Sequence, residues 1–458
     1  MIRFSRILFL IPLIGIVSSC APAQVDVQPT VAVEASAEPI RDLGLLPLDD
    51  PQVRADVELL IQSQQSRTPE DIALIRKWHS RPVVAWNEQA RYWVSYYGMD
   101  PVVASRVYAL TSVAQQRALD AFEFVEVDFS TRLPGQLDPN IGPVATPGNP
   151  FESAVLIGAT EPVFLYLFAQ TENEIRAVFD EARKALLDSG NILPSDLEKA
   201  VGFGETIADE LILERKDDGS ADAKKFDSLP SGEGIWHFDP FRARPEQPGW
   251  GRVAPWLMST PDQFRAQPPP AFGSLAFQAA VEEVRFQQES ISQGQLAIAQ
   301  KWADKRFTPT PAGHWNLIAV DLILQYDLSD RDAARALSAL NMAQMDAGIA
   351  CWESKYHYMV VRPWQADPRI SALVGYPNHP SYPSGHSCFS SASAETLSYF
   401  FPAERENLWQ MASEASISRF YGGIHYLFDM EAGTEIGRQI GALAEEFAAT
   451  QKWYPFVP

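Results

Sequence analysis

Apolar residues recur three and four positions apart along most of this chain, and this spacing limits its fold more than any other feature. Strand-like alternation is scarce, and no internal repeat is evident. The helical period is clearest in residues 69–97, 102–124, 172–189, 195–215, 329–356, 384–400, 404–420 and 430–450. The sequence therefore predicts an all-α protein built from helical bundles.

Residues 229–270 break this period with many Pro, Gly and Trp residues. Long irregular segments in compact proteins usually line a site or cover a surface. We therefore expect an N-terminal helical half over 41–270 and a C-terminal helical half over 271–458. The same pattern is also compatible with one continuous fold.

The first residues have the pattern of an export signal. An apolar run over 7–17 follows two arginines and is too short to cross a bilayer comfortably. Cys20 comes directly after two serines, which resembles a bacterial lipoprotein cleavage box. We predict a lipoprotein signal peptide over 1–20, acylation of Cys20 and a flexible tether over 21–40. An ordinary signal peptide with an incidental cysteine is the alternative.

This interpretation implies an exported, lipid-anchored protein of the bacterial cell envelope, with the outer membrane favoured, facing the periplasm or the exterior. The chain has 37 basic and 58 acidic residues, a net charge of -21. Such a charge argues against binding to nucleic acid and against direct contact with anionic membranes. Membrane contact is expected only through the lipid anchor, and any bound anion needs a local basic pocket.

Three segments in the last quarter of the chain concentrate Lys, Arg, Ser, Gly and His. They are residues 355–363, 382–387 and 418–429. Lys355, Arg362 and Arg419 provide three positive charges, and the fork of arginine suits tetrahedral oxyanions. Ser384 and Gly385 open a predicted helix, whose N-terminus favours anions. This set predicts a site for a phosphate-shaped anion.

Histidines complete the pattern. If His425 and Asp429 lie on one helix, their spacing puts them on one face, so Asp429 can accept a proton from one ring nitrogen. The other nitrogen is then unprotonated, as a nucleophile or a metal ligand requires. His386 remains for acid–base work. Each element alone is ordinary, as a solvated charge, a helix start or a surface pair, and only the combination predicts a site.

The residue order is Lys, six residues, Arg-Pro; then Pro-Ser-Gly-His; then Ser-Arg, five residues, His, three residues, Asp. This order resembles the superfamily shared by vanadium-dependent haloperoxidases, type 2 phosphatidic acid phosphatases and bacterial acid phosphatases. The motifs span residues 355–429. The resemblance implies two four-helix bundles, with the anion site in the C-terminal bundle and the catalytic domain over 271–458.

The resemblance also implies roles. His425 would bond vanadium in a haloperoxidase or attack phosphorus in a phosphatase, and Asp429 would orient it. His386 would be the acid–base residue, and Lys355 would also polarise the peroxide. The oxygens of vanadate, or of phosphate in its place, would be held by Lys355, Arg362, Ser384, Gly385 and Arg419. The reactants would be hydrogen peroxide, a halide and a small organic acceptor, with hypohalous acid formed in between.

Two features favour the peroxidase branch over the phosphatases. The sequence around Trp352 and residues 308–316 resembles haloperoxidases. The membrane phosphatases of the superfamily carry several spanning helices, and its soluble acid phosphatases are much shorter. Hydrolysis of phosphomonoesters through a phosphohistidine on His425 is the alternative, and a binding protein without catalysis is a third hypothesis. The oligomeric state stays open, a homodimer included.

Halide choice depends on His379, seven residues before His386. Algal bromoperoxidases tend to have histidine there and fungal chloroperoxidases phenylalanine, so bromide or iodide is favoured. We assign Trp352 and His379 to the halide pocket. The alternatives are that Trp352 is an ordinary core residue and that His379 is a loop histidine without a role.

Nearby residues allow weaker predictions. Asp304 is a candidate partner of Arg419, and His314 is expected to pack beside the site. Pairing of Cys351 with Cys388 stays open, with buried free thiols favoured.

Overall fold

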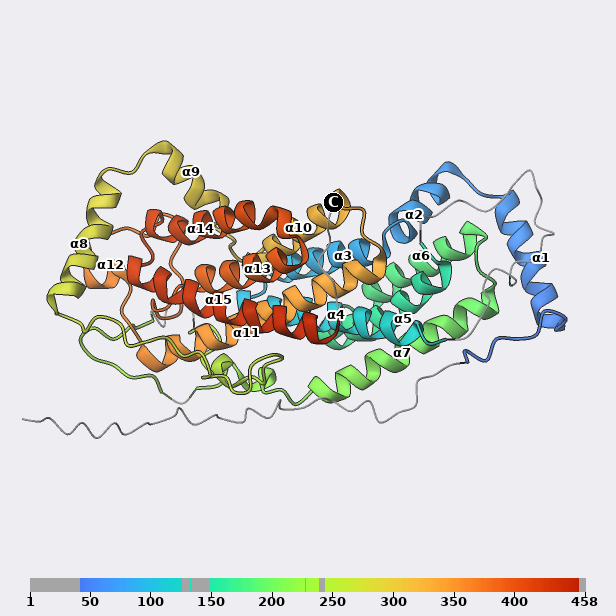
Figure 1. Cartoon of the computed structure of the whole chain (residues 1–458), viewed down its shortest axis with the longest axis horizontal. Helices are drawn as coiled ribbons and strands as arrows, with labels where there is room; N and C mark the ends of the chain where they lie inside the picture. The colour runs from blue at the N-terminus through green and yellow to red at the C-terminus, as the bar shows by residue number, and fades with distance from the viewer. Residues whose placement is uncertain (1–41, 126–131, 133–147, 227, 239–243, 453–458) are drawn as a thin grey trace, which may run out of the picture. The chain divides into compact units, whose positions relative to one another are not determined.

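The computed structural model describes residues 42–125, 132, 148–226, 228–238 and 244–452. They belong to one compact unit, Pro39–Pro458. The predicted signal peptide, the tether and Cys20 lie outside the described residues. The described residues form fifteen α-helices, and their only strand-like pairing is an isolated bridge between Ile235 and Val360 (Figure 1). The all-α prediction is confirmed.

The helices of the N-terminal part are α1 (Pro51–Gln65), α2 (Pro69–His79), α3 (Pro82–Tyr97), α4 (Pro101–Phe122), α5 (Pro150–Leu167), α6 (Glu172–Ser189) and α7 (Pro194–Arg215). Those of the C-terminal part are α8 (Leu275–Glu289), α9 (Gln293–Lys301), α10 (Thr310–Gln325), α11 (Asp330–Tyr358), α12 (Pro363–Ala366), α13 (Gly385–Phe400), α14 (Arg405–Tyr421) and α15 (Leu427–Thr450).

Proline explains where several helices begin. The stretch 69–97, predicted as one helix, is two helices that meet at Pro82. Proline lacks the N–H that an interior position donates, but it suits the first turn. Helix α5 was not predicted because it is apolar on nearly every side and shows no periodic stripe; most of it is buried. None of the described helices alone meets the length and hydropathy of a membrane span, although the bent pair Pro150–Leu167 and Ala169–Ser189 does together.

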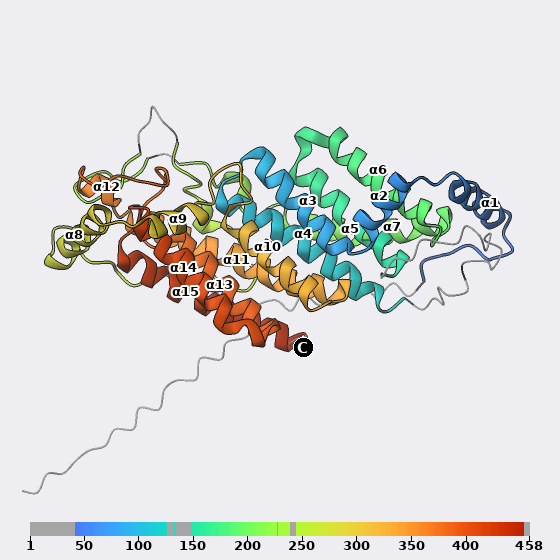
Figure 2. The same cartoon turned by 90° about the horizontal axis from the view of Figure 1, so that it is seen from above.

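The largest apolar cluster draws on both parts of the chain. Trp86 of α3 stacks on Phe179 of α6 at 4.3 Å between ring centroids. Trp315 of α10 and Leu337 of α11 belong to the same cluster. Figure 2 shows α3 and α4 lying beside α10 and α11. The boundary near residue 270 stays a prediction.

Helices α13 and α15 touch through glycines. A Cβ atom on Gly433 would lie 2.5 Å from the carbonyl oxygen of Ser384, and one on Gly437 would lie 2.4 Å from that of Cys388. Only glycine permits this backbone approach. The backbone N–H of Ser384 donates to the carbonyl of Asp429 at 2.8 Å. The N-terminal ends of the two helices, which carry motif residues, are therefore held together.

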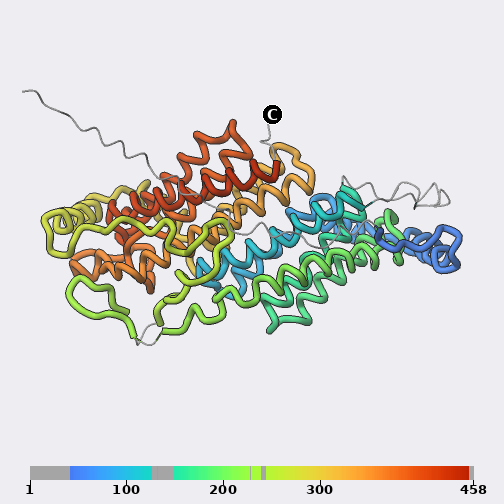
Figure 3. The backbone as a smooth tube through the Cα atoms, turned by 60° about the horizontal axis from the view of Figure 1, so that its bottom comes forward, coloured from blue at the N-terminus to red at the C-terminus, as the bar shows by residue number. Residues whose placement is uncertain are grey.

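The irregular segment after α7 packs on the C-terminal helices (Figure 3). The backbone N–H of Trp236 donates to the carbonyl of Met359 at 2.7 Å. Three consecutive N–H groups, from Trp256 to Met258, donate to the carboxylate of Asp346 on α11. This segment also reaches the candidate site, as its irregular composition predicted.

Candidate active site

The ends of four helices and the loops beside them bring the motif residues together. Lys355 lies in the last turn of α11 and Arg419 in the last turn of α14. Ser384 is the N-cap of α13 and Gly385 its first residue. His425 comes directly before Tyr426, the N-cap of α15.

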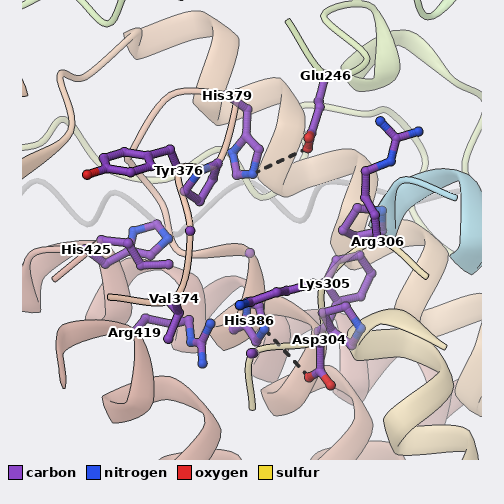
Figure 4. A pocket seen from close by; sticks show the side chains of 18 of the residues that line it. Glu246, Asp304, Lys305, Arg306, Val374, Tyr376, His379, His386, Arg419 and His425 are labelled. Carbon is purple, nitrogen blue, oxygen red and sulfur yellow. Dashed lines mark ion pairs between the residues drawn. The ribbon is translucent and has the colours of Figure 1, made fainter. Parts of the chain in front are cut away.

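These residues surround a pocket of about 310 Å³. Its lining includes Trp352, His379, Gly385, His386, Arg419 and His425 (Figure 4). Four other predicted residues are fully buried and do not line the pocket: Lys355, Arg362, Ser384 and Asp429.

His425 is held by Asp429 at the helix start. Its Nδ1 lies 2.7 Å from Oδ2 of Asp429, which also accepts from the backbone N–H of Tyr426 at 3.2 Å and from the hydroxyl of Ser381 at 2.5 Å. The predicted contact between Asp429 and one ring nitrogen is present, but it does not come from a shared helix face: Asp429 caps the first turn of α15, and His425 precedes the helix. The carboxylate therefore serves the helix N-terminus and the imidazole at once.

Arg362 fixes the tautomers of two histidines. Its Nη1 lies 3.1 Å from Nε2 of His425, and its Nη2 lies 3.0 Å from Nδ1 of His379. Arginine can only donate, so both ring nitrogens accept. His425 therefore carries its proton on Nδ1, toward Asp429, and its Nε2 is unprotonated. Arg362 also donates to the carbonyls of His379 and Ile424.

Lys355 and Arg419 are also bonded within the fold. The three donors of Lys355 Nζ reach the carbonyls of Pro380, Ser381 and Pro383. In this structure Lys355 therefore braces the loop before α13. Arg419 donates from Nε to the hydroxyl of Ser418 at 2.8 Å and from Nη2 to the carbonyl of Ala299 at 2.9 Å.

The site has an excess of buried positive charge. Burial lowers the pKa of Lys355 to about 8 and those of Arg362 and Arg419 to about 10. Burial also raises the pKa of Asp429 to about 6, against hydrogen bonds and cations that lower it. Buried cations without carboxylate partners are costly, and this arrangement is typical of a functional anion site.

His386 faces an acidic residue across the pocket. Its Nε2 lies 3.7 Å from Oδ2 of Asp304, and neither atom has a hydrogen-bond partner among the described residues (Figure 4). Burial and nearby Arg419 hold the pKa of His386 well below its usual range. The other oxygen of Asp304 contacts Nδ1 of His314 at 3.1 Å, so Asp304 is closer to histidines than to the predicted partner Arg419.

The remaining predicted neighbours lie close to the pocket. The rings of Trp352 and His379 are 4.8 Å apart and both line it. His314 stacks on Trp302 at 4.3 Å, which places it beside the site as expected. Cys351 and Cys388 are buried and free.

Sequence reasoning missed several pocket residues, among them Glu246, Arg306 and Tyr376, and Glu246 is the acidic one. It belongs to the irregular segment, lines the pocket and lies 3.9 Å from Nε2 of His379. Burial raises its pKa to about 7, as does the charge of Asp100. No motif marks it, and the only signal was that an irregular segment of this length tends to line a site.

A family model matches the part of the chain that holds the candidate site. Residues 335–453, which carry all the motif residues, match the PAP2 superfamily. No curated protein matches the chain.

Solved structures share the fold over most of the chain. A bacterial vanadium-dependent iodoperoxidase superposes with a TM-score of 0.65 at 23% identity, covering 79% of this chain and 95% of its own. A holo-type bacterial vanadium-dependent chloroperoxidase superposes with a TM-score of 0.58 at 16% identity, covering 80% of this chain and 97% of its own. The chain therefore shares the fold of these structures, and its residues 335–453 match the PAP2 superfamily.

Proposed function

We propose that this protein is a vanadate-dependent haloperoxidase that uses hydrogen peroxide to oxidise bromide or iodide to hypohalous acid, which then halogenates a small organic acceptor. One observation carries the proposal: the unprotonated Nε2 of His425 lies among buried cations that have no carboxylate partner among the described residues. The fold shared with an iodoperoxidase and a chloroperoxidase supports it.

The residues present fit vanadate, a tetrahedral oxyanion. His425 Nε2 would be the ligand to vanadium, and Gly385 and Arg419, which line the pocket, would hold its oxygens. Lys355, Arg362 and Ser384 lie behind the pocket wall and would join them by exchanging hydrogen bonds that they now make within the fold. Gly385 lines the pocket without a side chain, so its backbone faces the site directly. Bound vanadate supplies a Lewis acid that activates hydrogen peroxide without a change in its own oxidation state.

The protein's own groups move and hold the protons. His386 is neutral at neutral pH because its pKa is lowered, and its Nε2 has no partner among the described residues. It can therefore accept a proton from hydrogen peroxide entering the pocket. Asp304 would stabilise the resulting positive ring. Asp429 keeps the proton of His425 on Nδ1, so Nε2 stays an acceptor, which Arg362 uses in this structure and which a ligand would take over.

A phosphatase remains the second candidate, because the same Nε2 could attack phosphorus and form a phosphohistidine. One assay pair separates the two. The protein is freed of phosphate, and bromination of a dye with peroxide is measured with and without orthovanadate. Hydrolysis of p-nitrophenyl phosphate is measured on the vanadate-free protein.

The proposal predicts bromination that requires vanadate and is lost in His425→Ala. Steady phosphate release that vanadate inhibits, with no bromination, would assign the phosphatase activity instead. Absence of both activities in the native protein would leave a binding protein without catalysis.

We also propose export and lipid anchoring through Cys20, on the strength of the N-terminal sequence alone. Radiolabelled palmitate should be incorporated by the native chain and not by Cys20→Ser. Labelling that is equal in both would contradict the anchor.

A further inference from the structure

The backbone of Glu246 is fixed against the site from three directions. Its N–H donates to the carbonyl of Asn378 at 2.9 Å. Its carbonyl accepts from the indole N–H of Trp352 at 3.1 Å and from the hydroxyl of Tyr356 at 2.8 Å. The main chain is therefore held on both sides of the Glu246 side chain, which turns into the pocket (Figure 4).

The tautomer of His379 determines what this side chain meets. Nδ1 of His379 accepts from Arg362, so the ring proton is on Nε2. The 3.3 Å contact of Nδ1 with the carbonyl of Pro380 is then not a hydrogen bond. Nε2–H faces Oε2 of Glu246 at 3.9 Å, which is too long for a direct hydrogen bond. The carboxyl group and the imidazole thus flank the same part of the pocket.

We propose that Glu246 links halide binding to protonation: its carboxylate repels halide from the His379 side of the pocket, and its neutral acid form admits halide. This inference deepens the proposed function and rests on it for the identity of the anion. Glu246 is a specificity-determining residue in this account and does not touch the reacting oxygen atoms.

The surroundings keep both forms of Glu246 accessible near neutral pH. The charged groups that face it are Asp100 at the N-terminus of α4, Arg306 before α10, Arg362 before α12 and Lys355 on α11. Burial is the largest influence and raises its pKa to about 7, and Asp100 raises it further; the three cations oppose them. The imidazoles of His379 and His386 titrate well below their usual range, so they stay neutral over the same interval.

The expected change in halide affinity when Glu246 ionises follows from Coulomb's law. A unit charge a few ångströms from a bound halide, at the effective dielectric of a protein pocket, changes affinity by roughly tenfold or more. The protonated fraction of Glu246 should fall from about nine-tenths to about one-tenth as pH rises from about 6 to about 8, so halide affinity should fall several-fold over this range.

Bromide itself is the probe. Line broadening of the bromide-81 NMR signal reports exchange into a protein site and needs neither vanadate nor turnover. The native protein, Glu246→Gln and the surface control Glu435→Gln are compared between about pH 6 and pH 8. We expect broadening to fall several-fold with rising pH in the native protein and in the control, and to stay high in Glu246→Gln.

The vanadate-loaded enzyme gives the second measurement. The bromide KM of the native enzyme should rise with pH while kcat at saturating bromide changes little, and the KM of Glu246→Gln should be flat. A pH dependence that persists unchanged in Glu246→Gln would overturn the proposal. Absence of turnover with the expected NMR result would refute the peroxidase and leave the proton-linked anion site standing.

Discussion

Two sets of buried cations in this molecule differ in their partners: one set is paired with carboxylates and the other is not. In the N-terminal part, Nε of Arg106 pairs with Asp218 at 2.7 Å, and Nη2 of Arg132 pairs with Asp196 at 2.5 Å. In the C-terminal part, three cations are buried still more deeply, have carbonyl, hydroxyl and imidazole partners, and make no ion pair with any carboxylate in the described chain; they are Lys355, Arg362 and Arg419.

This difference in partners indicates which cations form a ligand site. A cation paired with a buried carboxylate is neutralised within the fold and serves structure. The charge of a buried cation that lacks such a partner is not neutralised within the fold, so it can stabilise a bound anion. Both parts use the same packing device, a helix contact through glycine: α5 on α7 at Gly158 and α13 on α15 at Gly433. The two parts therefore pack their helices in the same way and differ in whether their buried cations are paired with carboxylates.

The largest expected effect is a loss of stability when a buried arginine of the N-terminal part loses its carboxylate partner. Asp218→Ala leaves Arg106 buried without its carboxylate and should lower the free energy of unfolding by about 3–5 kcal/mol. Arg362→Met removes an unpaired cation and should cost clearly less, but should abolish phosphate and vanadate binding. Urea unfolding of both variants measures this difference. Equal losses would show that the two sets of cations are not distinct.

The glycine contacts offer a second comparison. A Cβ atom at Gly158 would lie 2.0 Å from the carbonyl oxygen of Val201, so Gly158→Ala should destabilise the fold by about 1–3 kcal/mol. Gly433→Ala should cost a similar amount and also weaken vanadate binding at least roughly tenfold, because Ser384 would be displaced. Calorimetry on the folded fraction checks this. Unchanged affinity in Gly433→Ala would separate the helix contact from the site.

The unpaired cations should also be visible in the pH dependence of stability. The pKa of Lys355 is about 8 in the fold and higher in the unfolded chain, so the unfolded state binds more protons between these values. Stability of the native protein should therefore rise more steeply from about pH 8 to about pH 10 than that of Lys355→Met. Bound phosphate should reduce the difference, since an anion restores the usual pKa. Parallel stability curves would contradict this account.

The smallest effect concerns the halide. His379→Phe removes the imidazole between Arg362 and Glu246 and should shift the ratio of kcat/KM for bromide over chloride by a few-fold toward chloride. Initial rates with each halide at one pH measure the ratio. A ratio that does not move would remove His379 from the determinants of halide choice.

Much of this arrangement could be predicted from the sequence, for identifiable reasons. The helical period predicted the fold class and four of the eight helices in the described C-terminal part, α11, α13, α14 and α15. Motif order predicted that residues as distant as Lys355 and His425 share one site, and both belong to the surroundings of the pocket. Helix α5 was missed because burial on all sides removes the periodic stripe.

Other features depend on tertiary structure alone. Asp429 acts as a helix cap because α15 begins at Leu427, which the periodicity placed slightly later. Glu246 reaches the pocket from a segment without regular structure. Its carbonyl accepts a hydrogen bond from the indole N–H of Trp352, which lies 106 residues later in the chain. No local pattern encodes such a contact. The carbonyl partners of Lys355 likewise follow from the loop path before α13.

The central claim is that the cations around His425 form a site for one oxyanion. Isothermal titration calorimetry of orthovanadate into the phosphate-free protein tests it most directly. We predict one site per chain with micromolar or tighter affinity, competition by phosphate, and loss of binding in His425→Ala with circular dichroism unchanged. No heat of binding in the native protein, or equal binding in His425→Ala, would contradict the claim.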